Sequence, residues 1–244
     1  MARYAGIRAG SYAGISESTV MPSLSSIRIT NAAFSHLASP APVAIFIGGT
    51  SGIGEAMARA FAAHTKGNSN IVIVGRNKDA AEAIISSLPN PKALSRDFIQ
   101  CDVTLMKNVQ TTAQTIISKY PKINYLVLST GYSTLTGRDE TVEGIDKKLA
   151  VHYYARWKFI HDLVPALQSA KDANEEGAVV SVMGAGKGGQ IDVNDLGLKE
   201  TFSLKNAALA APTYNDLMLE VCLSSYNLDL PQFMLYSRSL LDIP

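Results

Sequence analysis

Short apolar runs alternate with longer stretches of mixed polar and apolar residues along most of the chain. From residue 43 onward the short runs predict strands at Val43–Ile47, Ile71–Val74, Asp97–Cys101, Ile123–Leu128 and Ala178–Met183. The longer stretches, with apolar residues at helical spacing, predict helices at Ile53–His64, Lys78–Leu88, Lys107–Lys119, Glu143–Gln168 and Ser203–Ser225. This alternation predicts an α/β fold, a single domain with a doubly wound parallel sheet flanked by helices. The ligand crevice of such a sheet lies at the carboxyl ends of its strands.

The two ends of the chain lack this pattern. Residues 1–40 are rich in Ser, Ala and Gly and are set off by Pro40-Ala-Pro42, so we expect a flexible leader there. Its first twenty residues are either a targeting leader or a start-site artefact. We expect the core domain to span residues 41–230 and a shortened C-terminal segment to span residues 231–244, in which Gln232–Tyr236 can begin a sixth strand. An open sheet edge there would favour a homo-oligomer.

Composition narrows the classes of partner. The chain has 244 residues, 47% of them hydrophobic, and a formal net charge of +1, which gives no electrostatic footprint for nucleic acid. No apolar stretch is long enough for a membrane span. The two cysteines, Cys101 and Cys222, lie far apart without the spacing of a metal site, so no metal is expected. We expect a cytoplasmic protein that binds a small-molecule substrate.

The first strand runs directly into a glycine-rich turn, Gly48-Gly-Thr-Ser-Gly52-Ile-Gly54, and then into a helix. Gly48 permits the tight turn, Gly52 lets the backbone approach a pyrophosphate, and Gly54 lets the helix pack closely on the strand. The helix N-terminus adds amides and a positive dipole end. A simple tight turn between strand and helix is the alternative. The residues expected to contact a dinucleotide here are Gly48, Thr50, Ser51, Gly52, Ile53 and Gly54.

The next two strands end in residues suited to the adenosine half of such a ligand. The second strand ends at Gly75 and is followed by Arg76 and Asn77, where NAD-dependent enzymes usually carry a carboxylate for the ribose 2′-hydroxyl. A guanidinium can instead pair bidentately with a 2′-phosphate, which favours NADP over NAD. The third strand delivers Asp102 and Val103 to the adenine edge. A solvated arginine and a helix-capping aspartate are the alternatives.

Together these motifs resemble those of the short-chain dehydrogenase/reductase family, whose turn reads Thr-Gly-x-x-x-Gly-x-Gly and whose third strand ends in Asp-Val. The resemblance covers about residues 43–226, with Ile47 in place of the family's threonine. Residues 21–31 and 137–156 are similar to fungal reductases of secondary metabolism. The resemblance implies a Rossmann fold and an NADP-dependent oxidoreductase acting on a carbonyl or alcohol of a small metabolite. Of the family's Asn-Asn-Ala-Gly after the fourth strand, only Gly131 is kept.

The catalytic positions implied by the resemblance are altered. The family uses a tyrosine as acid/base, a lysine four residues later, a serine after the fifth strand and an asparagine in the long fourth helix. Tyr214 is the candidate tyrosine, but Met218 stands at the lysine position and cannot lower the pKa of a phenol. Gly184 stands near the serine position, which leaves Ser181 as the nearest hydroxyl. His152, at the asparagine position, is either a proton carrier or a buried structural histidine.

Three functions therefore remain open. The first is an NADP-dependent oxidoreductase, and the second is a non-redox cyclase or isomerase that keeps the cofactor fold. The third is a catalytically inactive cofactor-binding protein. The stretch between Gly184 and Tyr214 is longer than usual in the family, and residues 192–200 look like part of an insertion. The fold does not choose among the three, because function depends on the site.

Overall fold

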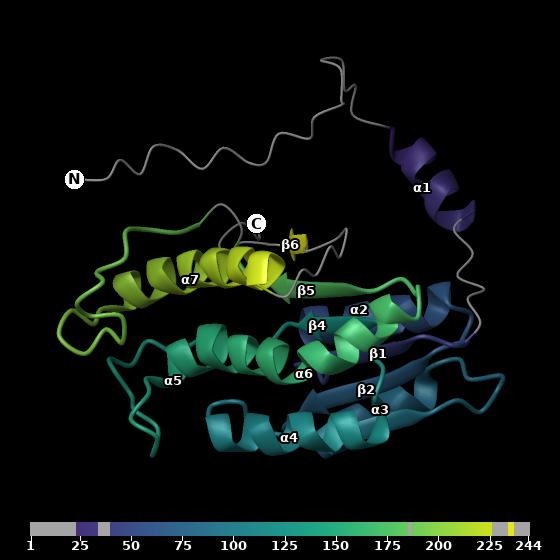
Figure 1. Cartoon of the computed structure of the whole chain (residues 1–244), viewed down its shortest axis with the longest axis horizontal. Helices are drawn as coiled ribbons and strands as arrows, with labels where there is room; N and C mark the ends of the chain where they lie inside the picture. The colour runs from purple at the N-terminus through teal and green to yellow at the C-terminus, as the bar shows by residue number, and fades with distance from the viewer. Residues whose placement is uncertain (1–22, 34–39, 185–186, 226–233, 237–244) are drawn as a thin grey trace. The chain divides into compact units, whose positions relative to one another are not determined.

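The structure is a computed structural model that describes residues 23–33, 40–184, 187–225 and 234–236. The described strands form one sheet in the order β3-β2-β1-β4-β5-β6 (Figure 1), and every neighbouring pair is parallel. The strands are β1 (Val43–Ile47), β2 (Asn70–Gly75), β3 (Arg96–Gln100), β4 (Tyr125–Leu128), β5 (Ala178–Val182) and β6 (Met234–Tyr236). The strand order reverses between β1 and β4, and a ligand crevice is expected at such a point. The predicted doubly wound Rossmann sheet is confirmed.

Helices cover both faces of this sheet. They are α2 (Gly52–His64), α3 (Lys78–Ser87), α4 (Met106–Lys119), α5 (Lys147–Leu149), the π-helix η1 (Ala150–Tyr154), α6 (Ala155–Asp172) and α7 (Leu204–Ser225). Alternate strand residues supply the two cores. Ile45 and Leu126 belong to a cluster with side chains of α4, α6 and α7, whereas Phe46 and Val127 belong to a cluster with α2 and α3. None of the described helices is long and apolar enough to cross a membrane.

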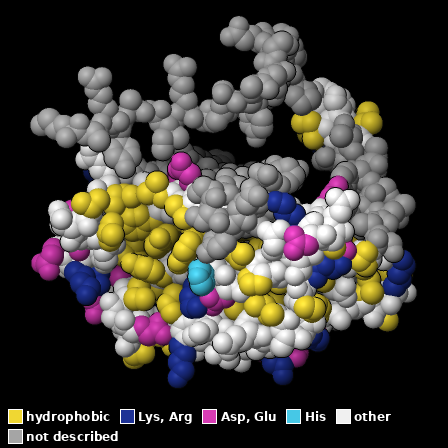
Figure 2. Space-filling view, viewed as in Figure 1, with side chains coloured by type: hydrophobic (Ala, Val, Ile, Leu, Met, Phe, Trp, Pro, Cys, Tyr) yellow, Lys and Arg dark blue, Asp and Glu magenta, His cyan; other side chains and the backbone are white. Residues whose placement is uncertain are grey.

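The face formed by α6 and α7 carries apolar side chains at its surface. Figure 2 shows hydrophobic side chains gathered over this part of the molecule. Among them Leu217 of α7 is 41% exposed, and Trp157 of α6 is only partly buried against the core.

The predicted helix over residues 143–168 was wrong at its N-terminal end. Gly144 has a φ of +74°, which suits a turn rather than a helix, and helical structure begins at Lys147. The carboxylate of Glu143 instead accepts hydrogen bonds from the backbone N–H groups of Met106 (2.6 Å) and Lys107 (3.0 Å). These amides lie in the first turn of α4, whose own residues offer no side-chain cap. A distant residue therefore caps α4.

The ends of the chain are described only in part. Helix α1 (Leu24–Ala33) lies within the predicted leader and was not predicted from the pattern. It belongs to a unit separate from the α/β domain, and the backbone N–H of Ser26 donates to Ser23 Oγ (3.1 Å) at its start. Strand β6 falls within the predicted sixth strand and pairs with β5. The remainder of the predicted leader and of the segment 231–244 lies outside the described residues.

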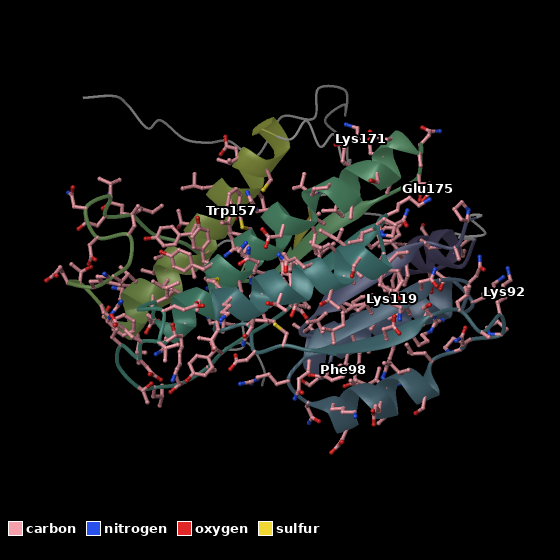
Figure 3. All side chains as sticks on the ribbon, turned by 60° about the horizontal axis from the view of Figure 1, so that its bottom comes forward. Lys92, Phe98, Lys119, Trp157, Lys171 and Glu175 are labelled. Atoms are coloured by element: carbon pink, nitrogen blue, oxygen red, sulfur yellow. The ribbon has the colours of Figure 1, made fainter. Side chains whose placement is uncertain are left out.

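Asn124 joins three segments at the edge where the strands begin. It is 3% exposed, and its Oδ1 accepts from the backbone N–H of Val43 (2.9 Å). Its Nδ2 donates to Oε2 of Glu175 (2.9 Å) and to the backbone oxygen of Glu176 (3.0 Å). Glu175 lies in the loop between α6 and β5, far from the carboxyl ends of the strands (Figure 3). One side chain therefore ties β1 and β4 to the loop that leads into β5.

We expect Asn124→Ala to lower the free energy of unfolding by about 1–3 kcal/mol, because it leaves the buried backbone N–H of Val43 without its acceptor. Urea denaturation measures the loss. Asn194→Ala is the matched control, since Asn194 is exposed, and it should change stability by less than about 0.5 kcal/mol. Equal effects of the two changes would contradict the role given to Asn124.

Candidate cofactor and active site

A cavity of about 610 Å³ opens at the carboxyl ends of β1, β2, β4 and β5, where the strand order reverses. Of the residues predicted to bind a dinucleotide, those that line it are Gly48, Thr50, Ser51, Gly52, Ile53, Arg76, Asp102, Val103 and Gly131. His152 lines it as well. The structure thus brings together side chains and backbone from five segments that are distant in sequence. Gly54 and Asn77 are the predicted cofactor residues that lie outside this lining.

The glycine turn has the geometry that the sequence predicted. Gly48 has a φ of +88°, and a Cβ added there would lie 2.8 Å from the backbone nitrogen of Thr130. A Cβ at Gly54 would collide with Ser129 Oγ and with the backbone oxygen of Gly48. By contrast, a Cβ at Gly52 or Gly131 would meet nothing within 4 Å, so their backbones face open space. Two glycines allow the close packing, and two leave backbone accessible to a ligand, which fits a dinucleotide cradle.

One end of the cavity is formed by Arg76 and Asp102. Arg76 is exposed and makes no ion pair with any described carboxylate. It also borders two smaller recesses, one of about 500 Å³ with Asn77 and one of about 370 Å³ with Asp102. Asn77 Oδ1 accepts from the backbone N–H of Ala80 (3.1 Å), so Asn77 caps α3 while it borders the recess. Asp102 does not cap a helix, because its carboxylate accepts from the N–H and hydroxyl of Thr104.

His152 lies at the opposite end of the cavity, in the π-helix η1. Its Nε2 accepts a hydrogen bond from the backbone N–H of Tyr132 (3.0 Å), so this nitrogen carries no proton. Burial, and then the positive charge of Arg156, lower the pKa of His152 to about 4. The imidazole is therefore neutral at pH 7 and holds the loop after β4 in place. Of the two roles left open by the sequence, the structure favours the structural one.

Arg156 is a residue of this site that the sequence reasoning did not select. It is 1% exposed and lines the cavity, and its Nη1 donates to Ser181 Oγ (2.7 Å) and to the backbone oxygen of Leu128 (3.1 Å). Its Nη2 donates to the backbone oxygen of Thr130 (2.6 Å). Arg156 follows His152 by four residues in an otherwise apolar stretch, and a charge at that spacing was the available signal.

Ser181 does not reach the cavity. It is fully buried, and its hydroxyl accepts from Arg156 and donates to Asn215 Oδ1 (3.2 Å). Asn215 Nδ2 in turn donates to the backbone oxygens of His152 (2.7 Å) and Ala211 (2.8 Å). A closed polar network of Arg156, Ser181 and Asn215 therefore links β4, β5, η1 and α7. This network holds Ser181 away from the cavity.

Tyr214 is also placed away from the cavity. Its hydroxyl donates to the backbone oxygen of Leu196 (3.0 Å), and its ring packs against Tyr153 at 5.1 Å between centroids. Leu196 belongs to the stretch read as an insertion, which Arg138 holds through the backbone oxygens of Gly197 and Leu198. Burial raises the pKa of the Tyr214 phenol above its usual value. The phenol that does line the cavity, among the described residues, belongs to Tyr132.

Protonation of His152 should weaken the fold in mild acid. The folded-state pKa of about 4 lies below the unfolded value near 6.5, so the unfolded state takes up the proton first as the pH falls from 6.5 towards 4. We expect this residue to account for a loss of about 2 kcal/mol in the free energy of unfolding between pH 7 and pH 5. His152→Asn, which keeps an acceptor, should flatten that part of the profile. Denaturant titrations at both pH values measure it, and parallel profiles for the two proteins would contradict a depressed pKa.

Comparison with known proteins agrees with this geometry. The sequence model of the family described as short chain dehydrogenase matches residues 42–191. The chain is 39% identical to oxidoreductase AN1596 of Emericella nidulans and 35% identical to oxidoreductase andH of Emericella variicolor, in each case over 82% of this chain and 58% of the relative. The matched stretch thus spans less than two thirds of each of these fungal oxidoreductases.

Solved structures share the fold at low identity. A metagenomic short-chain oxidoreductase in complex with NADP is 19% identical, with a TM-score of 0.61 and coverage of 83% of this chain and 84% of that one. A bulky-bulky ketone specific alcohol dehydrogenase from Comamonas testosteroni is also 19% identical, with a TM-score of 0.60 and coverage of 83% and 76%. On the family match and the fungal relatives together, the chain belongs to the short-chain dehydrogenase/reductase family of oxidoreductases.

Proposed function

We propose that the chain binds NADP(H) and transfers a hydride between it and a carbonyl or alcohol of a small metabolite, in fungal secondary metabolism. The proposal rests on the position of Arg76. This exposed cation lies at one end of the cavity, next to the glycine turn, and has no ionic partner among the described residues. A guanidinium there suits a 2′-phosphate. The solved relative in complex with NADP supports the same cofactor.

Different residues along the cavity would contact different parts of the cofactor. The accessible backbone at Gly52 and the N-terminus of α2 suit the pyrophosphate, and Asp102 with Val103 suits the adenine. Gly131, with open space above it, suits the ribose of the nicotinamide half. When bound, the nicotinamide would supply or accept the hydride. The substrate would then lie beside Tyr132, Val182, Met183 and Gly184, a mainly apolar group of lining residues.

A second candidate is a non-redox cyclase or isomerase on the same fold. The placement of Tyr214 favours it, because the phenol expected to deliver a proton is bonded to Leu196 outside the cavity. Transfer of label from deuterated NADPH to product distinguishes the two, since only the oxidoreductase moves the hydride. We propose the oxidoreductase because the cavity retains the features expected for the whole cofactor.

Changing Arg76→Glu should reverse the preference for NADPH over NADH. The unmodified chain should bind NADPH at least about tenfold more tightly, as expected for a charge-assisted pair of about 1.5–3 kcal/mol. Isothermal titration with both cofactors measures the two dissociation constants. Lys92→Glu is the matched control, because it makes the same charge change at the far end of the domain (Figure 3) and should leave the ratio unaltered. Equal affinities for both cofactors in the unmodified chain would show that Arg76 does not read the 2′-phosphate.

Changing Tyr214→Phe should reduce turnover by less than about tenfold, which is under about 1.4 kcal/mol of transition-state stabilisation. A positioned general acid is typically worth about 10² to 10⁴ in rate, so its loss would be far more severe. Steady-state kinetics with NADPH and a panel of small ketones measure the effect. Tyr132→Phe is the companion variant, because Tyr132 does line the cavity. If Tyr214→Phe abolished activity while NADPH affinity stayed intact, Tyr214 would be the proton donor after all.

A further inference from the structure

Arg156 is a buried positive charge that the described part of the chain leaves without a negative partner. Its three hydrogen-bond acceptors are two backbone oxygens and a hydroxyl, all neutral. None of the ion pairs among the described residues includes Arg156, and its buried Nε has no hydrogen-bond partner at all. Burial lowers the pKa of Arg156 to about 9, so the guanidinium remains charged at pH 7. An unpaired charge in a protein interior is expensive, and here the fold maintains it.

The charge has a defined place in the cavity. The carbonyl groups that hold it, those of Leu128 and Thr130, lie at the end of β4, and Ser181 lies on β5. Arg76 and Asp102 occupy the other end of the same cavity, at β2 and β3. If Arg76 receives the 2′-phosphate, the nicotinamide lies at the end that contains Arg156. Among the described lining residues at this end no carboxylate offsets the guanidinium, and the nearby His152 is neutral at pH 7.

We propose that Arg156 makes the chain prefer the reduced nicotinamide, whose ring is neutral, to the oxidised nicotinamide, whose ring carries a positive charge. This rests on the proposed binding of NADP(H). A charge that is poorly screened by water repels a like charge across several ångströms, whereas it leaves a neutral ring almost unaffected. An enzyme leaves the overall equilibrium of its reaction unchanged, so the preference acts on binding: the chain takes up the reduced cofactor and releases the oxidised one, which suits turnover in the reducing direction. The carbonyl carbon then takes the hydride, its oxygen takes a proton from water, and the oxidised cofactor is released.

The first test uses the unmodified protein and three ligands. NADPH and 1,4,5,6-tetrahydro-NADP have neutral rings, whereas NADP⁺ has a cationic one. Isothermal titration should show that the two neutral-ring ligands bind alike and on the order of tenfold more tightly than NADP⁺. The inference is overturned if NADP⁺ binds as tightly as NADPH. It is also overturned if the tetrahydro form binds as weakly as NADP⁺, because ring shape rather than charge would then decide.

A set of variants assigns the preference to Arg156. Arg156→Met removes the charge and should reduce the ratio of the NADP⁺ and NADPH dissociation constants from about ten to below about three. Arg156→Lys keeps the charge, and Ser181→Ala removes one hydrogen bond to Arg156 without changing the charge, so both should retain most of the ratio. A wild-type ratio in Arg156→Met would overturn the inference. If Arg156→Met does not fold, the ligand series with the unmodified protein decides.

The two proposals fail in different ways. If none of the three ligands binds, the proposed function is wrong and the inference falls with it. If all three bind with the same affinity, NADP(H) binding stands while the role of Arg156 is refuted. Because these readouts are equilibrium affinities, they do not depend on finding the substrate.

Discussion

The close contact between the turn after β1 and the end of β4 is the constraint on which the site depends. Ser129 Oγ donates to the backbone oxygens of Ile47 and Gly48, and only glycine at positions 48 and 54 leaves room for this approach. The contact fixes the backbone at Gly52 and orients the carbonyl groups of β4 that hold Arg156. The glycine turn and the end of the cavity that holds Arg156 therefore meet at one junction between two central strands, where the strand order reverses.

The fold could be predicted from sequence because its signals are local. Strand β1 was predicted to the residue, and most other elements to within one or two residues, since apolar periodicity and the glycine turn act over a few positions. The same local logic located Arg76, Asp102 and Gly131, each at the end of a strand. The local pattern did not predict where helical structure begins near residue 143. Glu143 caps α4 instead of entering a helix, and a local pattern does not reveal a partner so far along the chain.

The positions of the candidate catalytic residues were harder to predict from the sequence, because they depend on contacts between distant segments. The placement of Tyr214 is set by Leu196, in the stretch expected to be an insertion, and that of Ser181 is set by Arg156 and Asn215. Where the family resemblance implies a proton relay, the structure has a closed polar network that holds β4, β5, η1 and α7 together. Membership of the family thus describes the scaffold and the cofactor cradle, while the chemistry at the far end of the cavity has to be worked out from these particular side chains.

The π-helix η1 has a consequence for how such a site can change. A π-helical turn contains one residue more than an α-helical turn, and here the backbone N–H of Ala155 bonds to the oxygen of Ala150. Removing a single residue from Ala150–Tyr154 would restore α-helical winding and rotate everything before the deletion by about 100° relative to α6. His152 would then leave the amide of Tyr132, while Arg156 stayed where it is. A one-codon deletion would therefore separate His152 from Arg156, two residues that line the same cavity.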